Sequence, residues 1–261
     1  KKFMSSSSPT LLEYIRNTDI IPIAHRGASL LAGENSTEAF RKANELGYKL
    51  LETDVHGSKD GTAYIFHDDS LKRLTGDSRN ISDLRDSDID SIKINNSSAI
   101  PRLLEVFEEF PENYFNLDAK TWHAALPMAK AIKRNCFQSK VCIGSFNNSR
   151  INLILEELGS ETCHSMGTSN VIKFYLGSHS GFNLNFSAQC IQLPIAQFGI
   201  SLMTKNIIRY ARKLNIKIHF WTINDAPTIK KLLDLNVNGI MTDDCILLKE
   251  LMLERGKWPQ T

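Results

Sequence analysis

Short apolar runs rich in β-branched and aromatic residues recur along the chain from residue 20 onward, separated by segments with helical character. This alternation is typical of a parallel sheet whose strands are joined by crossover helices. The pattern predicts nine strands: IPIAHR (21–26), KLLETDV (49–55), TAYIFHD (62–68), YFNLDAK (114–120), VCIGSF (141–146), ETCHSM (161–166), QCIQLP (189–194), IKIHFWTI (216–223) and GIMTD (239–243).

Several of the linking segments carry helix signals. Residues 37–46 and 149–158 are helix-like stretches that run to Gly47 and Gly159, and glycine commonly follows the end of a helix. Residues 204–214 place apolar side chains at positions 207, 208, 211 and 214, which is the spacing of one helical face. We therefore expect crossover helices between the strands.

One predicted strand must run antiparallel to the strand before it. Only six residues, HGSKDG, separate the second and third predicted strands, whereas a parallel crossover needs a dozen or more. Asp60 and Gly61 are a strong signal for a two-residue hairpin turn. Pairing outward from that turn predicts that His67 lies opposite Asp54.

The eight remaining strands and their helical links predict a (β/α)8 TIM barrel, an α/β fold. An open doubly wound sheet is the alternative, but no glycine-rich phosphate loop follows the first strand. We expect a single domain over residues 1–261. The polar stretch at 71–100, after the second strand and its hairpin, is interpreted as a small insertion that caps the barrel.

Polar side chains close several predicted strands, and the C-terminal strand ends of a TIM barrel carry the active site. Glu52 and Asp54 lie two residues apart and share one face of their strand, as do Asp118 and Lys120. Three converging carboxylates would be costly to bury without a compensating cation. A divalent cation with oxygen ligands, Mg²⁺ or Ca²⁺, fits this set better than zinc, because the sequence shows no Cys/His cluster.

Two histidines are expected beside these carboxylates. The hairpin brings His67 to Asp54, and His25 closes the neighbouring first strand together with Arg26. Two imidazoles, a Lewis acid and the cationic side chains of Arg26 and Lys120 suit displacement at a phosphodiester. One histidine would take a proton from the attacking hydroxyl, and the other would give a proton to the leaving oxygen.

Composition and charge narrow the class of protein. Hydrophobic residues make up 42% and charged residues 23%, as in ordinary folded domains, and a net charge of +2 without a basic stripe disfavours nucleic acid as a partner.

Neither a bilayer-length apolar run nor an apolar leader in residues 1–10 is present, so we expect no stable membrane insertion. Five scattered cysteines without close metal-type pairing are interpreted as reduced core residues of a cytoplasmic protein. The oligomeric state stays open.

An ordered set of short motifs runs through the chain: HRGA (25–28), EN (34–35), ETDV (52–55), KDG (59–61), HD (67–68), WTIN (221–224) and GIMTD (239–243). Each motif alone is a weak signal. In this order they resemble the glycerophosphodiester phosphodiesterase family, over about residues 21–253.

The resemblance implies a metal-dependent TIM-barrel enzyme that cleaves small-molecule glycerophosphodiesters to an alcohol and glycerol 3-phosphate. It also implies that the neighbouring glycerol hydroxyl attacks first, through a cyclic phosphate that water then opens. By position in the motifs, the resemblance implies that His25 and His67 are the acid/base pair. It implies that the metal ligands are Glu52, Asp54 and Asp118, and that the phosphate contacts are Arg26 and Lys120.

Three residues depart from the family pattern. Gly33 stands in place of a proline and Ser36 in place of a threonine, and both changes are mild. Asp118 stands where the family often has glutamate. Its shorter side chain must move the metal, admit a water or draw the strand closer.

Two further residues are candidate substrate contacts, each with alternatives. Glu34 orients His25 or Arg26, lies near the metal, or is a surface residue at a helix entry. Trp221 packs against the glycerol of the substrate or fills the core.

Two other functions are consistent with the same residues. A lysophospholipase D acting on longer lipids would keep the chemistry and would need an apolar groove beside the site. A catalytically inactive barrel that binds phosphorylated ligands would need the cationic side chains but not an acid/base pair, so the presence of both His25 and His67 disfavours it.

Overall fold

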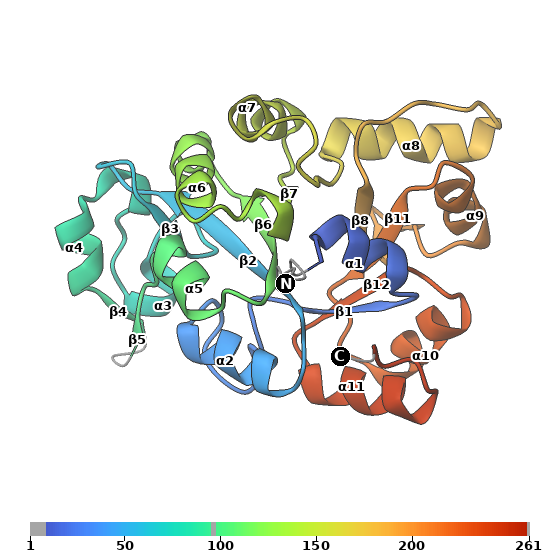
Figure 1. The fold of residues 1–261 in the computed structure, drawn as a ribbon, viewed down its shortest axis with the longest axis horizontal. Coiled ribbons are helices and arrows are strands. Elements are labelled where there is room, and N and C mark those ends of the chain that lie inside the picture. The colour runs from blue at the N-terminus through green and yellow to red at the C-terminus, as the bar shows by residue number, and fades with distance from the viewer. Residues whose placement is uncertain (1–8, 95–97, 260–261) are drawn as a thin grey trace, which may run out of the picture.

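Seven parallel strands form one curved sheet in the computed structural model, which describes residues 9–94 and 98–259 (Figure 1). In spatial order they are β7 (Val141–Gly144), β6 (Tyr114–Ala119), β2 (Leu50–Gly57), β1 (Ile21–Ala24), β12 (Gly239–Thr242), β11 (Lys217–Trp221) and β8 (Cys190–Pro194). The expected single domain over residues 1–261 includes residues 1–8, 95–97 and 260–261, which lie outside the described residues.

The prediction of an eighth barrel strand at residues 161–166 was wrong, because this segment pairs with each neighbour through only one isolated bridge. Ile143 bridges to His164 on one side, and Ser165 bridges to Cys190 on the other. Helix α7 (Asn148–Leu158) ends just before the segment and α8 (Thr168–Ser180) begins just after it, which leaves little length for a strand. The two ends of the sheet therefore meet at a seam, residues 161–166, held by fewer backbone pairs than the rest of the barrel.

Helices cover the outer face of the sheet, and their apolar sides form the main core against it. The helices predicted at 37–46, 149–158 and 204–214 are confirmed by α2 (Thr37–Glu45), α7 and α9 (Lys205–Lys213). The barrel helices are α2 (Thr37–Glu45), α5 (Leu103–Glu109), α6 (Trp122–Arg134), α7, α8, α9 (Lys205–Lys213), α10 (Ala226–Asp234) and α11 (Cys245–Glu254).

The N-terminal end of the barrel is covered by α1 (Leu11–Asn17). Leu11 and Ile15 are buried among side chains that point into the barrel interior, including those of Ile23 and Tyr114. Tyr14 stacks on Tyr114 with 4.9 Å between ring centroids. This end of the barrel is consequently closed to solvent, and the opposite end carries the polar residues.

The predicted hairpin is present, but its register was wrong by one residue. Strand β3 (Ala63–Ile65) pairs antiparallel with β2, and Val55 lies opposite Ile65. A two-residue turn of the expected kind needs positive φ at both central residues, and here Gly61 has φ +84° while Asp60 does not have positive φ. The loop instead has three residues, closed by the Ser58 N–H donating to Thr62 O at 2.9 Å.

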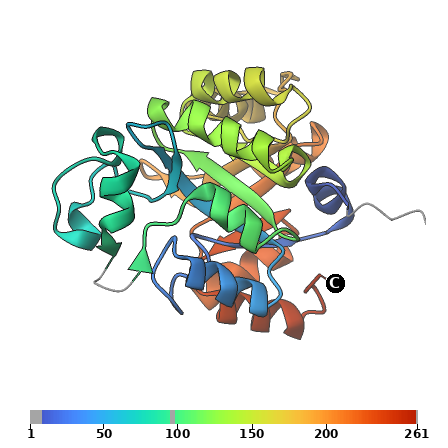
Figure 2. The ribbon, with the colours of Figure 1, turned by 60° about the vertical axis from the view of Figure 1, so that its left-hand side comes forward.

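Residues 71–94 and 98–100 form an excursion from the barrel with a small core of its own (Figure 1, with α3 and α4 on the side away from α8 and α9). Its elements are α3 (Lys72–Thr75), η1 (Ile81–Asp83), α4 (Asp86–Ser91), β4 (Lys93–Ile94) and β5 (Ser98–Ala99). Ser58 and Thr62 of the hairpin each donate a hydrogen bond to Asp86, at 2.6 Å in both cases. Figure 2 shows the excursion and α1 on opposite sides of the molecule.

Within the described parts of the chain, no helix has both the length and the apolar character needed to cross a bilayer.

Candidate active site

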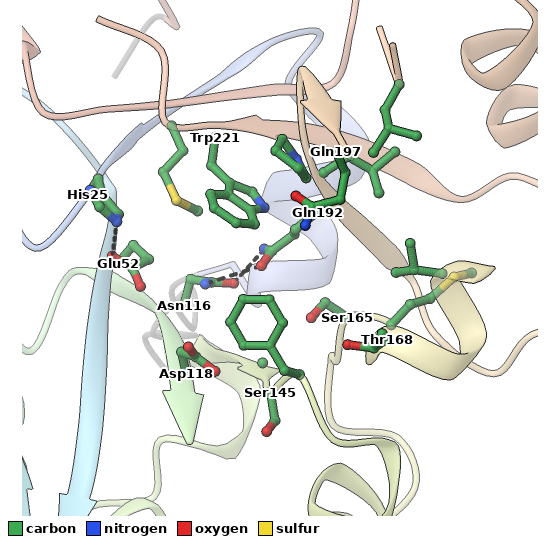
Figure 3. Close-up of a pocket in the computed structure, with 18 of the residues that line it drawn as sticks. His25, Glu52, Asn116, Asp118, Ser145, Ser165, Thr168, Gln192, Gln197 and Trp221 are labelled. Carbon is green, nitrogen blue, oxygen red and sulfur yellow. Dashed lines mark hydrogen bonds and ion pairs between the residues drawn. The ribbon is translucent and has the colours of Figure 1, made fainter. Parts of the chain in front are cut away.

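Side chains from the C-terminal ends of several barrel strands line one cavity of about 460 Å³ (Figure 3). All but one of the predicted site residues contribute to its lining, and Glu34 is the exception. The predicted residues in the lining are His25, Arg26, Glu52, Asp54, His67, Asp118, Lys120 and Trp221. The strand ends thus bring together residues that are as far apart in the chain as positions 25 and 221.

The three carboxylates lie on two adjacent strands. Asp54 of β2 and Asp118 of β6 are direct register partners, and Glu52 lies one pleat earlier on the same face of β2. Glu52 and Asp54 are only 4% and 3% exposed. Lys120 Nζ lies 3.3 Å from Asp54 Oδ1 and 3.2 Å from Asp118 Oδ2, so one ammonium group is shared between two carboxylates.

The protonation of these carboxylates reflects incomplete compensation of their charge. Burial, and then the adjacent negative charge of Asp54, raise the pKa of Glu52 to about 7. Burial also raises the pKa of Asp118. For Asp54 burial acts in the same direction, but Lys120 and Arg26 outweigh it and hold the Asp54 pKa below its ordinary value. The cationic side chains therefore compensate the negative charge of Asp54 more completely than the negative charges of Glu52 and Asp118.

The loop after β1 is folded so that Arg26 contacts the carboxylates through both its backbone N–H and its side chain. Arg26 has a left-handed backbone with φ +54°, an uncommon conformation for a residue other than glycine. Its backbone N–H donates to Glu52 Oε2 at 2.9 Å, and its Nε lies 3.3 Å from Asp54 Oδ2. The Asn35 N–H donates to Arg26 O at 3.0 Å, and Asn35 Nδ2 donates to Asp54 Oδ2 at 2.9 Å. The strained conformation is thus fixed by contacts to the carboxylates of β2.

His25 is held by a carboxylate that the sequence analysis did not assign to the site. Its Nδ1 lies 2.7 Å from Asp243 Oδ1. Its Nε2 lies 3.9 Å from Glu52 Oε2, and Figure 3 shows these two side chains facing each other. Burial lowers the His25 pKa, but the charges of Glu52 and Asp243 outweigh it, so the pKa is raised. Asp243 also accepts hydrogen bonds from Ser29 and Asn224, at 2.9 and 2.7 Å. Its position directly after β12 is the same strand-end signal that identified the other acidic residues.

His67 has a similar arrangement. Its Nδ1 lies 2.6 Å from Asp68 Oδ1, so each of the two histidines has a carboxylate on Nδ1. The hydrogen bond from Arg73 is the largest cause that lowers the Asp68 pKa to about 2. The corrected hairpin register places Phe66 rather than His67 opposite Asp54, since the Phe66 N–H donates to Asp54 O at 3.1 Å. His67 nevertheless lines the cavity, one residue beyond that pair.

Glu34 lies behind the cavity and connects two arginines. Its Oε1 accepts hydrogen bonds from Arg26 Nη1 at 3.0 Å and from Arg73 Nη2 at 2.6 Å. Of the roles expected for Glu34, the structure places it against Arg26 and not against His25. Arg73 comes from α3 of the excursion, and no motif in the sequence pointed to it.

One wall of the cavity is apolar. It is built from the loop after β7, from α8 and from the hairpin of β9 (Ala196–Gln197) and β10 (Ile200–Ser201). Trp221 lines the cavity and meets Phe146 edge to face, with 6.2 Å between the ring centroids. Phe198 at the hairpin tip is 93% exposed. Other apolar members of this wall are Phe146, Met166, Val171, Ile172, Leu193, Ile200 and Leu202.

Comparisons with known proteins agree with this fold. A sequence model of the glycerophosphoryl diester phosphodiesterase family matches residues 25–247. The chain is 31% identical over 261 residues to the probable glycerophosphodiester phosphodiesterase 2 of Mycobacterium tuberculosis, covering 98% of this chain and 99% of that protein. It is 25% identical over 289 residues to lysophospholipase D GDPD1 of Homo sapiens, covering 96% and 92%.

Among solved structures, the chain is similar to an Oleispira antarctica phosphodiesterase in complex with the product sn-glycerol-3-phosphate. The TM-score is 0.74 at 20% identity, and the match covers 89% of this chain and 96% of that one. The expected TIM-barrel class is confirmed by this similarity together with the family match.

Replacing Asp243 with asparagine tests whether the Asp243 carboxylate raises the pKa of His25. The Asp243→Asn variant removes a negative charge that raises the His25 pKa, so that pKa should fall. The measurement is an NMR titration of the His25 ring in metal-free protein. Asp234→Asn, which neutralises an exposed carboxylate on α10, is the control and should leave the His25 titration unchanged. An unshifted His25 pKa in Asp243→Asn would contradict the assignment.

Proposed function

The chain belongs to the glycerophosphoryl diester phosphodiesterase family and is a phosphoric diester hydrolase, and we propose that it cleaves glycerophosphodiesters to an alcohol and glycerol 3-phosphate with a divalent cation and two histidines. The observation that carries this proposal is the position of His25 and His67 at one cavity, each with a carboxylate on Nδ1, beside two buried carboxylates and one partly buried carboxylate. A binder of phosphorylated ligands has no use for such a pair.

Glu52, Asp54 and Asp118 would hold the cation. The donor set fits Mg²⁺ or Ca²⁺, because it consists of oxygen atoms and because burial, and then the charge of Asp54, raise the pKa of Glu52 to about 7, a penalty that a cation would offset. Lys120 and Arg26 both contact Asp54, and the three carboxylates do not form a compact ligand cluster within the described residues. When bound, the cation would supply charge neutralisation and polarisation of the phosphoryl oxygens.

Arg26 and Lys120 are assigned to the non-bridging phosphate oxygens. Both line the cavity, and both already contact Asp54, so their cationic groups are positioned before substrate enters. The Arg26 guanidinium is further fixed by Glu34. Pre-positioned cations stabilise negative charge on a transferring phosphoryl group without reorganisation during the reaction.

His25 and His67 are assigned to the proton transfers. In each ring the Nδ1 atom is held by an aspartate, so the Nε2 atom is the one available to the reacting groups. One ring takes the proton from the attacking glycerol hydroxyl, and the other donates a proton to the leaving alkoxide. Water then opens the cyclic phosphate with the two roles reversed.

A longer lipid substrate is the second candidate, and the apolar wall favours it. A lysophospholipid carries one acyl chain, and the cavity continues from the carboxylates to Ile172 of α8 and to the exposed Phe198. The human relative with 25% identity is named a lysophospholipase D.

The five free cysteines agree with a reducing location, and we retain a cytoplasmic site of action as part of the proposal.

Removal of divalent ions should abolish the hydrolysis of glycerophosphocholine. We expect EDTA treatment to eliminate turnover, and Mg²⁺ or Ca²⁺ added in excess to restore it, because the buried carboxylates would lose their counter-ion. Release of choline or glycerol 3-phosphate is the assay. Full activity after exhaustive chelation would remove the metal from the mechanism.

Truncation of either histidine should reduce turnover by about 10² to 10⁴-fold, the usual contribution of a general acid or base. The variants are His25→Ala and His67→Ala, assayed with metal present in excess. His123→Ala is the matched control, because that side chain is exposed and outside the cavity lining. If either active-site variant turned over like the wild type, that histidine would have no part in the proton transfers.

The apolar wall separates the two substrate candidates. If lysophospholipids are bound, Phe198→Ser should raise KM for lysophosphatidylcholine by roughly tenfold, on the order of the 1–3 kcal/mol of a buried apolar side chain. The same variant should leave kinetics on glycerophosphocholine unchanged, since Phe198 lies at the outer end of the cavity. Equal kinetics on both substrates before and after substitution would remove Phe198 from lipid recognition.

A further inference from the structure

Three cysteines that are far apart in the sequence meet inside the barrel, below the cavity. Cys142 lies on β7, Cys163 lies in the seam segment, and Cys190 begins β8. Their Sγ atoms all lie within 4.8 Å of one another, and all three side chains are buried among the residues beneath α1. None belongs to a disulfide, and none lines the cavity of the candidate active site.

This spacing suits a metal ion. Zn²⁺ binds thiolate sulfur at about 2.3 Å, which puts the sulfur atoms of a tetrahedral site about 3.8 Å apart. The observed limit of 4.8 Å allows that arrangement after only a small shift of side chains. Thiolates favour Zn²⁺ and Cu⁺ over the oxygen-preferring ions expected at Glu52, Asp54 and Asp118. The two sites would therefore select different metals.

A buried histidine on the strand next to β8 gives a second, independent indication. His219 of β11, the strand next to β8, is 1% exposed, and its Nε2 has no hydrogen-bond partner. A buried polar atom without a partner is unfavourable unless something else binds it. His219 lies two residues beyond Lys217, the register partner of Cys190, and so on the same face of β11, but its ring nitrogens lie outside the group of thiols that are within 4.8 Å of one another.

We propose that Cys142, Cys163 and Cys190 form a structural site for one thiophilic cation, Zn²⁺ in the first instance, and that the His219 ring would have to move toward the three thiols to serve as a fourth ligand. Binding releases the thiol protons and places the metal across the seam. The seam is where the sheet has only isolated bridges, and the three cysteines come from its two flanking strands and from the segment between them. The ion would bind these three backbone segments together where hydrogen bonding is sparse.

The test uses the full chain, expressed with Zn²⁺ or with Co²⁺ as a spectroscopic probe and then dialysed against EDTA. We expect about one equivalent of metal to stay bound, and the Co²⁺ form to show thiolate-to-metal charge-transfer absorption in the near ultraviolet. An oxygen-lined site gives no such band, so failure of the active-site proposal would not affect this readout. The triple variant Cys142→Ser/Cys163→Ser/Cys190→Ser should lose both the band and the retained metal.

Cys245→Ser is the matched control, because Cys245 is buried on α11 away from the cluster and its loss should leave band and stoichiometry unchanged. If the triple variant does not fold, Cys163→Ser replaces it, and Zn²⁺ should raise the Tm of the wild type by about 5–10 °C but not that of the variant. The proposal is overturned if wild-type protein refolded in excess Zn²⁺ or Co²⁺ retains no metal and shows no thiolate band. It is equally overturned if a folded variant without these thiols behaves as the wild type does.

Discussion

Three carboxylates, two buried and one partly buried, at the ends of two neighbouring strands are the constraint on which the rest of the site depends. Asp54 and Asp118 face each other across β2 and β6, and Glu52 lies one pleat below. Carboxylates in such a position must be paired, hydrogen-bonded or neutral. The surrounding structure does all three, since Lys120 bridges two of them, the Arg26 backbone binds Glu52, and burial raises the pKa of Glu52 to about 7.

The same requirement explains the shape of the loop after β1. A left-handed conformation at Arg26 is unfavourable by itself, yet it turns the N–H toward Glu52 and lets the side chain reach Asp54. Asn35, at the other end of this loop, closes it through Arg26 O and binds Asp54 as well. His25 is carried on the same turn, so its position depends on the carboxylates it is proposed to serve.

Much of this arrangement could be predicted from the sequence, because strand ends in a barrel converge and polar residues there are conspicuous in apolar runs. The strands carrying Glu52, Asp118 and Trp221 were identified, and so was the hairpin that carries His67. The hairpin register was wrong because Asp60-Gly61 fits both two-residue and three-residue loops, and only the backbone angle at Asp60 distinguishes them.

Other features depend on residues that become neighbours only in the folded chain, so no local sequence pattern indicated them. The expected strand at 161–166 has a suitable composition, but its length is limited by the helices on either side. The spacing of Cys142, Cys163 and Cys190 in the chain resembles no metal motif, because they become neighbours only when the barrel closes. Arg73 belongs to a polar stretch that was predicted only as a small insertion capping the barrel, with no residue of it assigned to the site.

Arg73 links the excursion to the candidate active site. Arg73 binds both Glu34, which holds Arg26, and Asp68, which holds His67. A single side chain thus spans the two loops that bear the proposed phosphate contact and one of the proposed proton-transfer groups. Insertions or deletions anywhere in residues 71–100 that displaced α3 would alter the distance between those loops. Through this one side chain, the excursion therefore constrains the relative positions of the proposed phosphate contact and proton-transfer group.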